Sequence, residues 1–207
     1  MTVKRPLLVG LTGSIGMGKT ETAGMFARLG IPVYDADAAV HQLYASGGEA
    51  VAAIEKAFPE CVDSGQVNRA CLSTKVRTDK AALARLEAIV HPLVAREQEA
   101  FIARAAANGA EIVLLDIPLL FETGADTRLE AVVVVTAPCD VQRARVLARP
   151  GMTEKLFEQI LARQLPDVDK QERAHFIVET DKGMDHAFEQ VKRIVSELHA
   201  RQRGDDA

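Results

Sequence analysis

A glycine-rich segment near the beginning of the chain constrains the fold more than any other feature. It reads Gly13-Ser14-Ile15-Gly16-Met17-Gly18-Lys19-Thr20 and follows a short, almost continuous apolar run, Leu7 to Thr12. Such a run is typical of a strand that is buried on both faces of a parallel sheet. Apolar residues with helical spacing follow, up to Leu29. The order of strand, glycine-rich turn and helix predicts a loop whose backbone N–H groups bind phosphate.

This phosphate loop predicts a nucleoside triphosphate site. We expect Lys19 to reach the β- and γ-phosphates and the Thr20 hydroxyl to bind Mg²⁺. The other residues of the loop and the following Glu21 are expected to contact ATP. An incidental glycine-rich turn is a poor alternative for a complete motif in this context. The motif does not identify the reaction, because GTPases, ATPases, kinases and motor domains share it. The sequence contains no Asn-Lys-x-Asp segment, which GTPases use to read the base.

Alternating strands and helices predict an α/β fold around a parallel sheet. Besides the first strand, strands are expected over residues 31–34, 112–116, 131–136 and 176–178. The long helical stretch between the second and third of these strands exceeds a minimal crossover, so we expect it to form a side lobe. Inside it, Pro92 is expected to end one helix and begin the next.

Acidic residues follow two of the predicted strands. Asp35 and Asp37 come after the second strand, at the sheet edge where open α/β proteins bind ligands. Because Asp is a favoured helix cap, we expect one of them to cap the next helix. The other would orient an acceptor hydroxyl and take its proton. Asp116 ends the strand 112–116 and is expected to help hold Mg²⁺.

Arginines gather around a helix predicted over residues 140–147. Arg145 and Arg149 are four residues apart, so we expect them to share a helix face. Pro150-Gly151 breaks the helix, and another begins directly afterwards. An arginine-rich helix, break and helix suit a mobile lid that closes over a triphosphate and excludes water. The alternative is a set of solvated surface arginines.

Composition narrows the class of partner. The net charge is −4, aromatic residues make up 4% and Trp is absent, which argues against a general nucleic-acid binder. No apolar stretch approaches the length of a membrane span, so we expect a cytoplasmic protein that acts on small molecules. Cys61, Cys71 and Cys139 are odd in number and lack CxxC spacing. We therefore expect reduced thiols rather than a disulfide or a zinc site.

Several segments, taken in order, resemble the dephospho-CoA kinase family. They are Leu11-Thr12 with the phosphate loop, Asp35-Ala36-Asp37, Val90-His91-Pro92 and Asp116-Ile117-Pro118-Leu119-Leu120-Phe121-Glu122, followed by Gln142, Arg145, Arg149 and Gln164. The phosphate loop is shared by many families, whereas the other segments in this order are specific. The similarity extends over nearly the whole chain, to about Thr180.

The resemblance implies a P-loop NTPase fold of the nucleoside-monophosphate-kinase type, in which helices flank a five-stranded parallel sheet. The implied parts are a core over about 1–37, 108–144 and 170–207, a helical acceptor-binding lobe over about 38–107, and a lid over about 145–169. The implied reaction transfers the γ-phosphoryl group of ATP to the 3′-hydroxyl of dephospho-CoA, giving CoA and ADP with Mg²⁺ as cofactor. This is the last step of CoA synthesis. A monomer or small homo-oligomer is expected.

The resemblance also implies residue roles. Asp35 would be the catalytic base. Lys19, Arg145 and Arg149 would stabilise charge on the transferred phosphoryl group. Thr20 would hold Mg²⁺, with Asp116 behind it. The implied acceptor site consists of Asp37, His91, Leu119, Phe121 and Glu122.

Three positions depart from the family pattern. Pro150 stands where an Asp usually follows the lid arginine, and His175 and Thr180 replace an Asp and an Asn. The last two replacements leave the contacts to adenine open. Two alternatives remain at this point: a kinase of the same fold that phosphorylates a nucleoside or nucleotide, and a non-catalytic nucleotide-binding switch. The first would differ in the lobe, and the second would not need Asp35 and the arginines together.

Overall fold

The computed structural model describes residues 5–204, so the outermost ends of the predicted core lie outside the described residues. The chain divides into two compact units. The first consists of Met1–Tyr34 and Arg104–Ala207, and the second of Asp35–Ala103. Each unit contains a hydrophobic cluster of its own.

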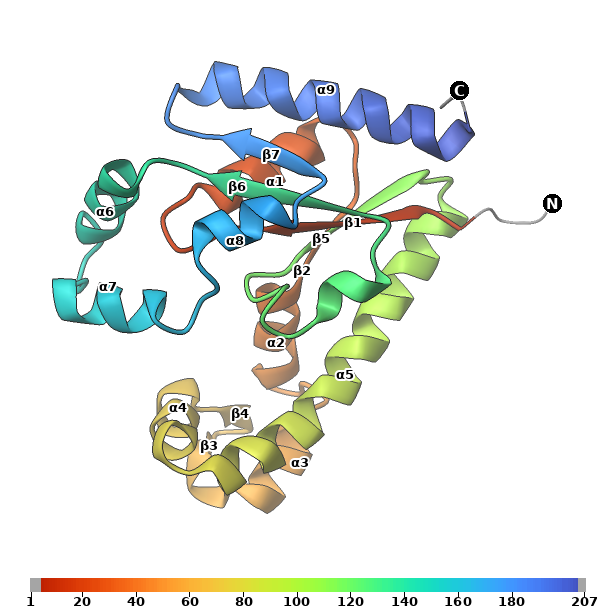
Figure 1. Ribbon diagram of the computed structural model, residues 1–207. Helices are drawn as coiled ribbons and strands as arrows, with labels where there is room; N and C mark the ends of the chain where they lie inside the picture. Colours follow the sequence, from red (N-terminus) through yellow and green to blue (C-terminus); the bar gives the residue numbers. More distant parts are fainter. Residues whose placement is uncertain (1–4, 205–207) are drawn as a thin grey trace. The chain divides into compact units, whose positions relative to one another are not determined.

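Five strands form the main sheet, in the order β2-β5-β1-β6-β7 (Figure 1). Their bounds are β1 Leu7–Thr12, β2 Val33–Asp35, β5 Ile112–Asp116, β6 Ala131–Thr136 and β7 Phe176–Glu179. The central strand β1 runs parallel to β5 on one side and to β6 on the other. The predicted five-stranded α/β sheet is confirmed. Because β1 is central, the phosphate loop that follows it lies in the middle of the carboxyl edge, the place where open α/β sheets bind ligands.

Side chains of β6 pack on both faces of the sheet, because successive residues of a strand point to opposite sides. Val133 and Val135 belong to the larger cluster, which includes residues of α1 (Lys19–Arg28) and α9 (Met184–Arg203). Val132 and Val134 belong to a second cluster with Leu120 and Phe121. Figure 1 shows α9 running alongside β7 and α1. Burial on both faces explains the continuous run of β-branched residues in β6.

Three further helices connect β6 to β7: α6 Cys139–Leu147, α7 Glu154–Leu161 and α8 Asp167–Glu172. The helix predicted to begin after the Pro150-Gly151 break is confirmed as α7. The Thr153 hydroxyl caps it by accepting the Leu156 N–H at 3.2 Å. The expectation that Arg145 and Arg149 share a helix face is wrong, because α6 ends at Leu147. The physical reason is Pro150, which disfavours the helical conformation of the residue before it.

The second unit is mostly helical. Its elements are α2 Ala36–Tyr44, α3 Val51–Ala57, the short helix η1 Pro59–Cys61, β3 Val62–Asp63, β4 Gln66–Val67, α4 Arg69–Thr78 and most of α5 Lys80–Ala107. The strands β3 and β4 form an antiparallel hairpin that was not predicted. Its turn places Ser64 and Gly65 at φ 51° and 74°, the left-handed conformations that a tight hairpin requires. Two-residue strands are too short to show a periodic sequence signal.

The predicted helix boundary at Pro92 is wrong. Helix α5 continues through this residue, although an interior proline removes one backbone hydrogen bond and costs about 3 kcal/mol. Side chains on both sides of the proline pack into the same cluster, among them Leu86, Val90, Leu93 and Val94. We attribute the unbroken helix to this shared packing, because a fully buried side chain such as Val90 contributes about 1.5–3 kcal/mol and its partly buried neighbours add to this.

The expectation of three reduced cysteines is also wrong. Cys61 and Cys71 form a disulfide, with Cα atoms 5.3 Å apart, and Cys139 is the free thiol. The reason is tertiary: η1 and α4 pack together, which brings Cys71 beside the fully buried Cys61. Sequence spacing alone does not determine which cysteines meet in a fold.

Candidate active site

The loop between β1 and α1 curls through two glycines in left-handed conformations. Gly16 has φ 80° and Gly18 has φ 94°, values that residues with a side chain rarely adopt. The Met17 N–H donates to the Ser14 carbonyl at 3.2 Å and closes the loop. A Cβ atom on Gly16 would lie 2.4 Å from Val146 Cγ2. The predicted strand, loop and helix are therefore present, and α6 packs directly against the loop.

The structure pairs two of the predicted site residues beneath this loop. The Lys19 ammonium, in the first turn of α1, forms an ion pair with the Asp116 carboxylate at the end of β5. Their side chains are only 18% and 8% exposed. Thr20 and Glu21, on the same turn, are exposed. The cation of Lys19 and the hydroxyl-bearing residue Thr20 thus lie where the loop N–H groups and the helix N-terminus favour the binding of anions.

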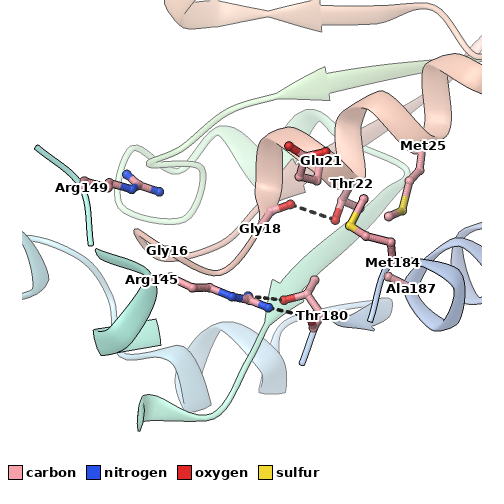
Figure 2. A pocket seen from close by; sticks show the side chains of 10 residues that line it. All are labelled: Gly16, Gly18, Glu21, Thr22, Met25, Arg145, Arg149, Thr180, Met184 and Ala187. Atoms are coloured by element: carbon pink, nitrogen blue, oxygen red, sulfur yellow. Dashed lines mark hydrogen bonds between the residues drawn. The ribbon is translucent and has the colours of Figure 1, made fainter. Parts of the chain in front are cut away.

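A cavity of about 260 Å³ lies beside the loop (Figure 2). Its volume is slightly below that of most small-molecule pockets. It is lined by Gly16, Gly18, Glu21, Thr22, Met25, Arg145, Arg149, Thr180, Met184 and Ala187. Five of these, Gly16, Gly18, Glu21, Arg145 and Arg149, were predicted. Thr180 had been singled out only as a departure from the family pattern. The other four, on α1 and α9, were missed because small and apolar residues of helices look like ordinary core positions in a sequence.

Arg145 is fixed to the wall of this cavity by Thr180. Its two terminal nitrogens donate to the Thr180 hydroxyl and carbonyl oxygens at 2.8 and 2.7 Å. The Thr180 hydroxyl in turn donates to the Met17 carbonyl at 2.8 Å. Thr180 therefore links the arginine to the phosphate loop, whereas Arg149 is exposed at the cavity rim. Figure 2 shows both arginines and Thr180 around the cavity.

His175 and Thr180, the two departures from the family pattern near β7, lie at opposite ends of that strand. Thr180 follows β7 and lines the cavity. His175 precedes β7. Its ring Nδ1 accepts the Val132 N–H at 3.1 Å, and its backbone N–H donates to the Val132 carbonyl at 2.9 Å. His175 thus extends the pairing of β6 and β7 at the amino-terminal edge of the sheet. Of these two departures, Thr180 is the one that affects the cavity.

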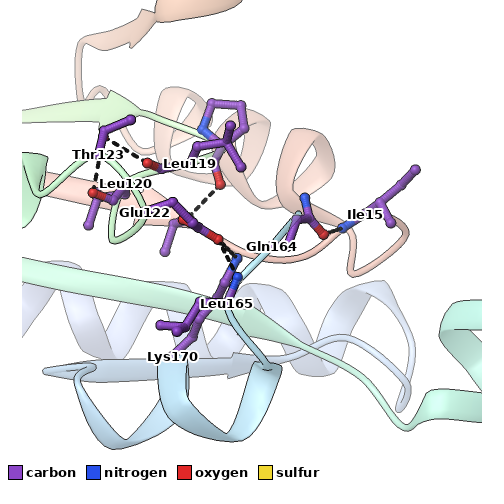
Figure 3. Close-up of polar contacts among 10 residues, drawn as sticks. Ile15, Leu119, Leu120, Glu122, Thr123, Gln164, Leu165 and Lys170 are labelled. Carbon is purple, nitrogen blue, oxygen red and sulfur yellow. Dashed lines mark hydrogen bonds and ion pairs between the residues drawn. The ribbon is translucent and has the colours of Figure 1, made fainter. Parts of the chain in front are cut away.

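The segment after β5 contains three predicted acceptor-site residues with different surroundings, and Figure 3 shows two of them, Leu119 and Glu122. Leu119 is 41% exposed, whereas Phe121 is buried in the sheet cluster. The Glu122 carboxylate accepts the Leu165 N–H at 2.7 Å and lies 3.0 Å from the ammonium of Lys170, which is fully buried. Burial raises the pKa of Glu122, but the N–H groups of Leu165 and Glu122 and the Lys170 ammonium together hold it below its usual range.

Lys170 was missed by sequence reasoning. It belongs to the strongly charged segment Asp167–Glu172, which resembles an exposed helix. Nothing in that pattern distinguishes the one side chain that is completely buried.

The remaining predicted residues belong to the second unit. Asp35 is the last residue of β2 and also the N-cap of α2, because its Oδ1 accepts the Ala38 N–H at 2.9 Å. One of Asp35 and Asp37 was expected to cap this helix, and the structure shows that it is Asp35. Asp37 lies in the first turn of α2, and His91 lies on α5; all three residues are exposed.

The described residues carry no preformed metal cluster and no membrane segment. Within residues 5–204, no group of three or more His, Cys, Asp or Glu side chains could hold a metal ion. In the same range, no helix combines the length and apolarity needed to cross a membrane.

Comparisons with known proteins agree with this fold. A dephospho-CoA kinase family model matches residues 7–186. The chain is 54% identical to a dephospho-CoA kinase of Mesorhizobium japonicum over 96% of its own length and 99% of that protein. A solved Thermus thermophilus protein is 34% identical with a TM-score of 0.84, covering 94% of this chain and 99% of that one. A dephospho-CoA kinase from Campylobacter jejuni, 19% identical over 94% and 98% of the two chains, has the same fold with a TM-score of 0.64. The chain therefore belongs to the dephospho-CoA kinase family.

Proposed function

We propose that the phosphate loop, Lys19 and Asp35 carry the reaction of this family, transfer of the γ-phosphoryl group of ATP to the 3′-hydroxyl of dephospho-CoA. The products are CoA and ADP. The observation that carries the residue assignment is the Lys19–Asp116 ion pair under a loop in which Gly16 and Gly18 have positive φ. This arrangement combines a glycine-rich loop, a helix N-terminus and a cation, which are features of triphosphate-binding sites.

In this proposal Lys19 exchanges its carboxylate partner for phosphate oxygens when ATP binds. Its positive charge then offsets the charge that develops during transfer. Arg145 and Arg149 add cationic charge from the cavity wall and rim, which is supported by their place in the cavity lining. The α7 region, with the predicted lid over residues 145–169, would exclude water, which competes with the acceptor for the phosphoryl group.

Asp35 is the proposed base. Its Oδ1 is used in capping α2, and this fixes the carboxylate while Oδ2 stays available to an acceptor hydroxyl. Asp35 ends a strand of the same sheet as β1 and β5, and ligands of such sheets bind beyond the carboxyl ends of the strands. Asp37, His91 and Leu119 are proposed to contact the acceptor. Phe121 and Glu122 would shape this site from behind, since both side chains are engaged within the protein.

Thr20 and Asp116 are the oxygen donors proposed for Mg²⁺, which when bound neutralises charge on the phosphate oxygens. In phosphoryl-transfer sites this ion takes one or two protein oxygens and completes its coordination with phosphates and water. Two donors therefore fit the ion, and a larger acidic cluster is not needed. We also propose that the protein acts on small molecules in the cytoplasm, as a monomer or small homo-oligomer.

The test is ADP release from ATP and Mg²⁺ with dephospho-CoA, AMP, CMP, adenosine or water as acceptor. We expect turnover with dephospho-CoA. Turnover only with a nucleotide or nucleoside would contradict the acceptor assignment, and no acceptor-dependent ADP would favour a nucleotide-binding switch. Asp35→Asn keeps the helix cap, because Asn caps as well as Asp, but removes the base and should lower kcat by about 10²–10⁴-fold.

A matched control is Asp79→Asn. Asp79 also caps a helix of the second unit, accepting the N–H groups of Ala81 and Ala82 at 2.8 and 3.0 Å. This variant should retain the wild-type kcat. Equal kcat values for the Asp35 and Asp79 variants would contradict the role of Asp35 as base.

A further inference from the structure

One residue of the phosphate loop, Ile15, is held from two sides by glutamine side chains. The Gln142 amide nitrogen donates to the Ile15 carbonyl at 2.8 Å, and the Gln164 amide oxygen accepts the Ile15 N–H at 3.1 Å. A backbone carbonyl only accepts and a backbone N–H only donates, so the orientation of both amides follows from their partners. Gln142 is only 5% exposed. Figure 3 shows the Gln164 side chain pointing to Ile15.

These two bonds orient the loop. In a trans peptide the carbonyl of one residue and the N–H of the next point in opposite directions. Because Gln142 holds the Ile15 carbonyl toward α6, it turns the Gly16 N–H away from α6. Because Gln164 holds the Ile15 N–H, it turns the Ser14 carbonyl to the opposite side, and this carbonyl accepts the Met17 N–H that closes the loop.

The same two glutamines bracket the arginine-bearing segment 143–163. Gln142 immediately precedes this segment, in α6, and Gln164 immediately follows it, between α7 and α8. Both ends of the segment are therefore bonded to one residue of the phosphate loop. The second end is fastened again one residue later, where the Leu165 N–H donates to Glu122. Arg145 and Arg149 lie inside the bracketed segment, so their positions depend on these attachments.

We propose that Gln142 and Gln164 are positioning residues that couple the bracketed segment to the phosphate loop through Ile15. This inference rests on the phosphoryl transfer proposed above. The two attachments hold the loop in its phosphate-binding form and keep the segment registered over the nucleotide. Loss of either one misplaces the arginines and admits water to the phosphoryl group.

The two glutamines use different atoms, and this permits a sharp test. Gln164→Met and Gln142→Met keep the side-chain length and remove the hydrogen bond. Gln164→Glu keeps an oxygen acceptor for the Ile15 N–H, whereas Gln142→Glu has no donor for the Ile15 carbonyl. Gln202→Met is the control, because Gln202 also donates to a backbone carbonyl, that of Arg5, at 3.1 Å, but lies outside the bracketed segment and the loop.

For each variant, kcat with dephospho-CoA and the ratio of acceptor-independent ATP hydrolysis to transfer are measured, with circular dichroism to verify folding. Both Met variants and Gln142→Glu should lower kcat about 10- to 100-fold, since a misplacement of about 1 Å at a reacting centre can cost about 10²-fold, and should raise the hydrolysis ratio. Gln164→Glu should keep both values close to wild type while its charge raises KM for ATP. Gln202→Met should change neither.

Several outcomes would overturn the inference. Folded Met variants with wild-type kcat and hydrolysis ratio would do so, and so would a control variant that changes both values equally. If a Met variant does not fold, the contrast between the two Glu variants still decides. A wild-type protein without dephospho-CoA-dependent ADP release would instead contradict the proposed function, and this is seen before any variant is compared.

Discussion

Removal of the charge of Glu122 should destabilise the protein strongly, although the residue was predicted as part of the acceptor site. Glu122→Gln retains an oxygen that can accept the Leu165 N–H, now at 2.7 Å. It removes the negative charge 3.0 Å from the Lys170 ammonium, whose side chain is 0% exposed while that of Glu122 is 16% exposed. The variant therefore tests one interaction, the ion pair, and leaves the neighbouring hydrogen bond in place.

The expected magnitude follows from the burial of Lys170. Breaking a buried ion pair by neutralising one partner costs about 3–5 kcal/mol, because an uncompensated charge remains inside the protein. Since Glu122 is partly exposed, we expect the lower end, about 3 kcal/mol, which is a large share of a typical stability of about 5–15 kcal/mol. Lys170→Met removes the buried charge itself, so no uncompensated charge remains, and it should cost only about 1 kcal/mol, the typical value for a single substitution. The double variant should be more stable than Glu122→Gln alone.

Urea unfolding followed by circular dichroism at neutral pH measures these differences. An exposed ion pair provides the control: Arg96 and Glu49 are 66% and 62% exposed, so Glu49→Gln should unfold close to the wild-type midpoint. A loss of less than about 1 kcal/mol in Glu122→Gln would contradict a strongly stabilising ion pair. The same conclusion would follow if Lys170→Met restored no stability in the Glu122→Gln background, because a double-mutant cycle detects coupling between the two sites.

Two further predictions concern pH and the disulfide. The pKa of Glu122 lies below its usual range in the folded protein, so the charged carboxylate stabilises the fold fully above the unfolded carboxyl pKa of about 4.3, and this stabilisation disappears as the pH falls through the folded-state pKa. The difference in unfolding free energy between wild type and Glu122→Gln should therefore shrink below about pH 4; a constant difference from pH 7 to pH 3 would contradict this. Alkylation without reduction should modify Cys139 alone, and three alkylated cysteines in the unreduced protein would show that the disulfide is absent. Cys71→Ser should lower the free energy of unfolding by about 3 kcal/mol, because the disulfide closes a loop with a sequence separation of 10.

Sequence reasoning located the parts of the site that depend on local chemistry. The phosphate loop could be predicted because Gly16 and Gly18 occupy backbone conformations that other residues avoid. Asp116 could be predicted because a charged residue directly follows four apolar ones at a strand end. The new helix after Pro150-Gly151 was expected for a similar reason, since proline and glycine interrupt a helix locally.

Contacts between distant segments could not be predicted in the same way. Thr180 appears in the sequence as a departure from the family pattern, and only the fold places its hydroxyl between Arg145 and the Met17 carbonyl. Arg149 was expected on a helix that ends two residues earlier. Pro92 was expected to interrupt a helix that continues, because packing around it outweighs a local preference.

The sequence by itself therefore determined the α/β class, the phosphate loop and its cation, since these depend on periodicity, glycine conformations and residues adjacent in the chain. Only the tertiary structure decided that Lys170 is buried against Glu122, that Cys61 meets Cys71, and that both glutamines bond to Ile15. The separation is physical. Local preferences act within a few residues, whereas burial and hydrogen-bond partners depend on which segments the fold brings together.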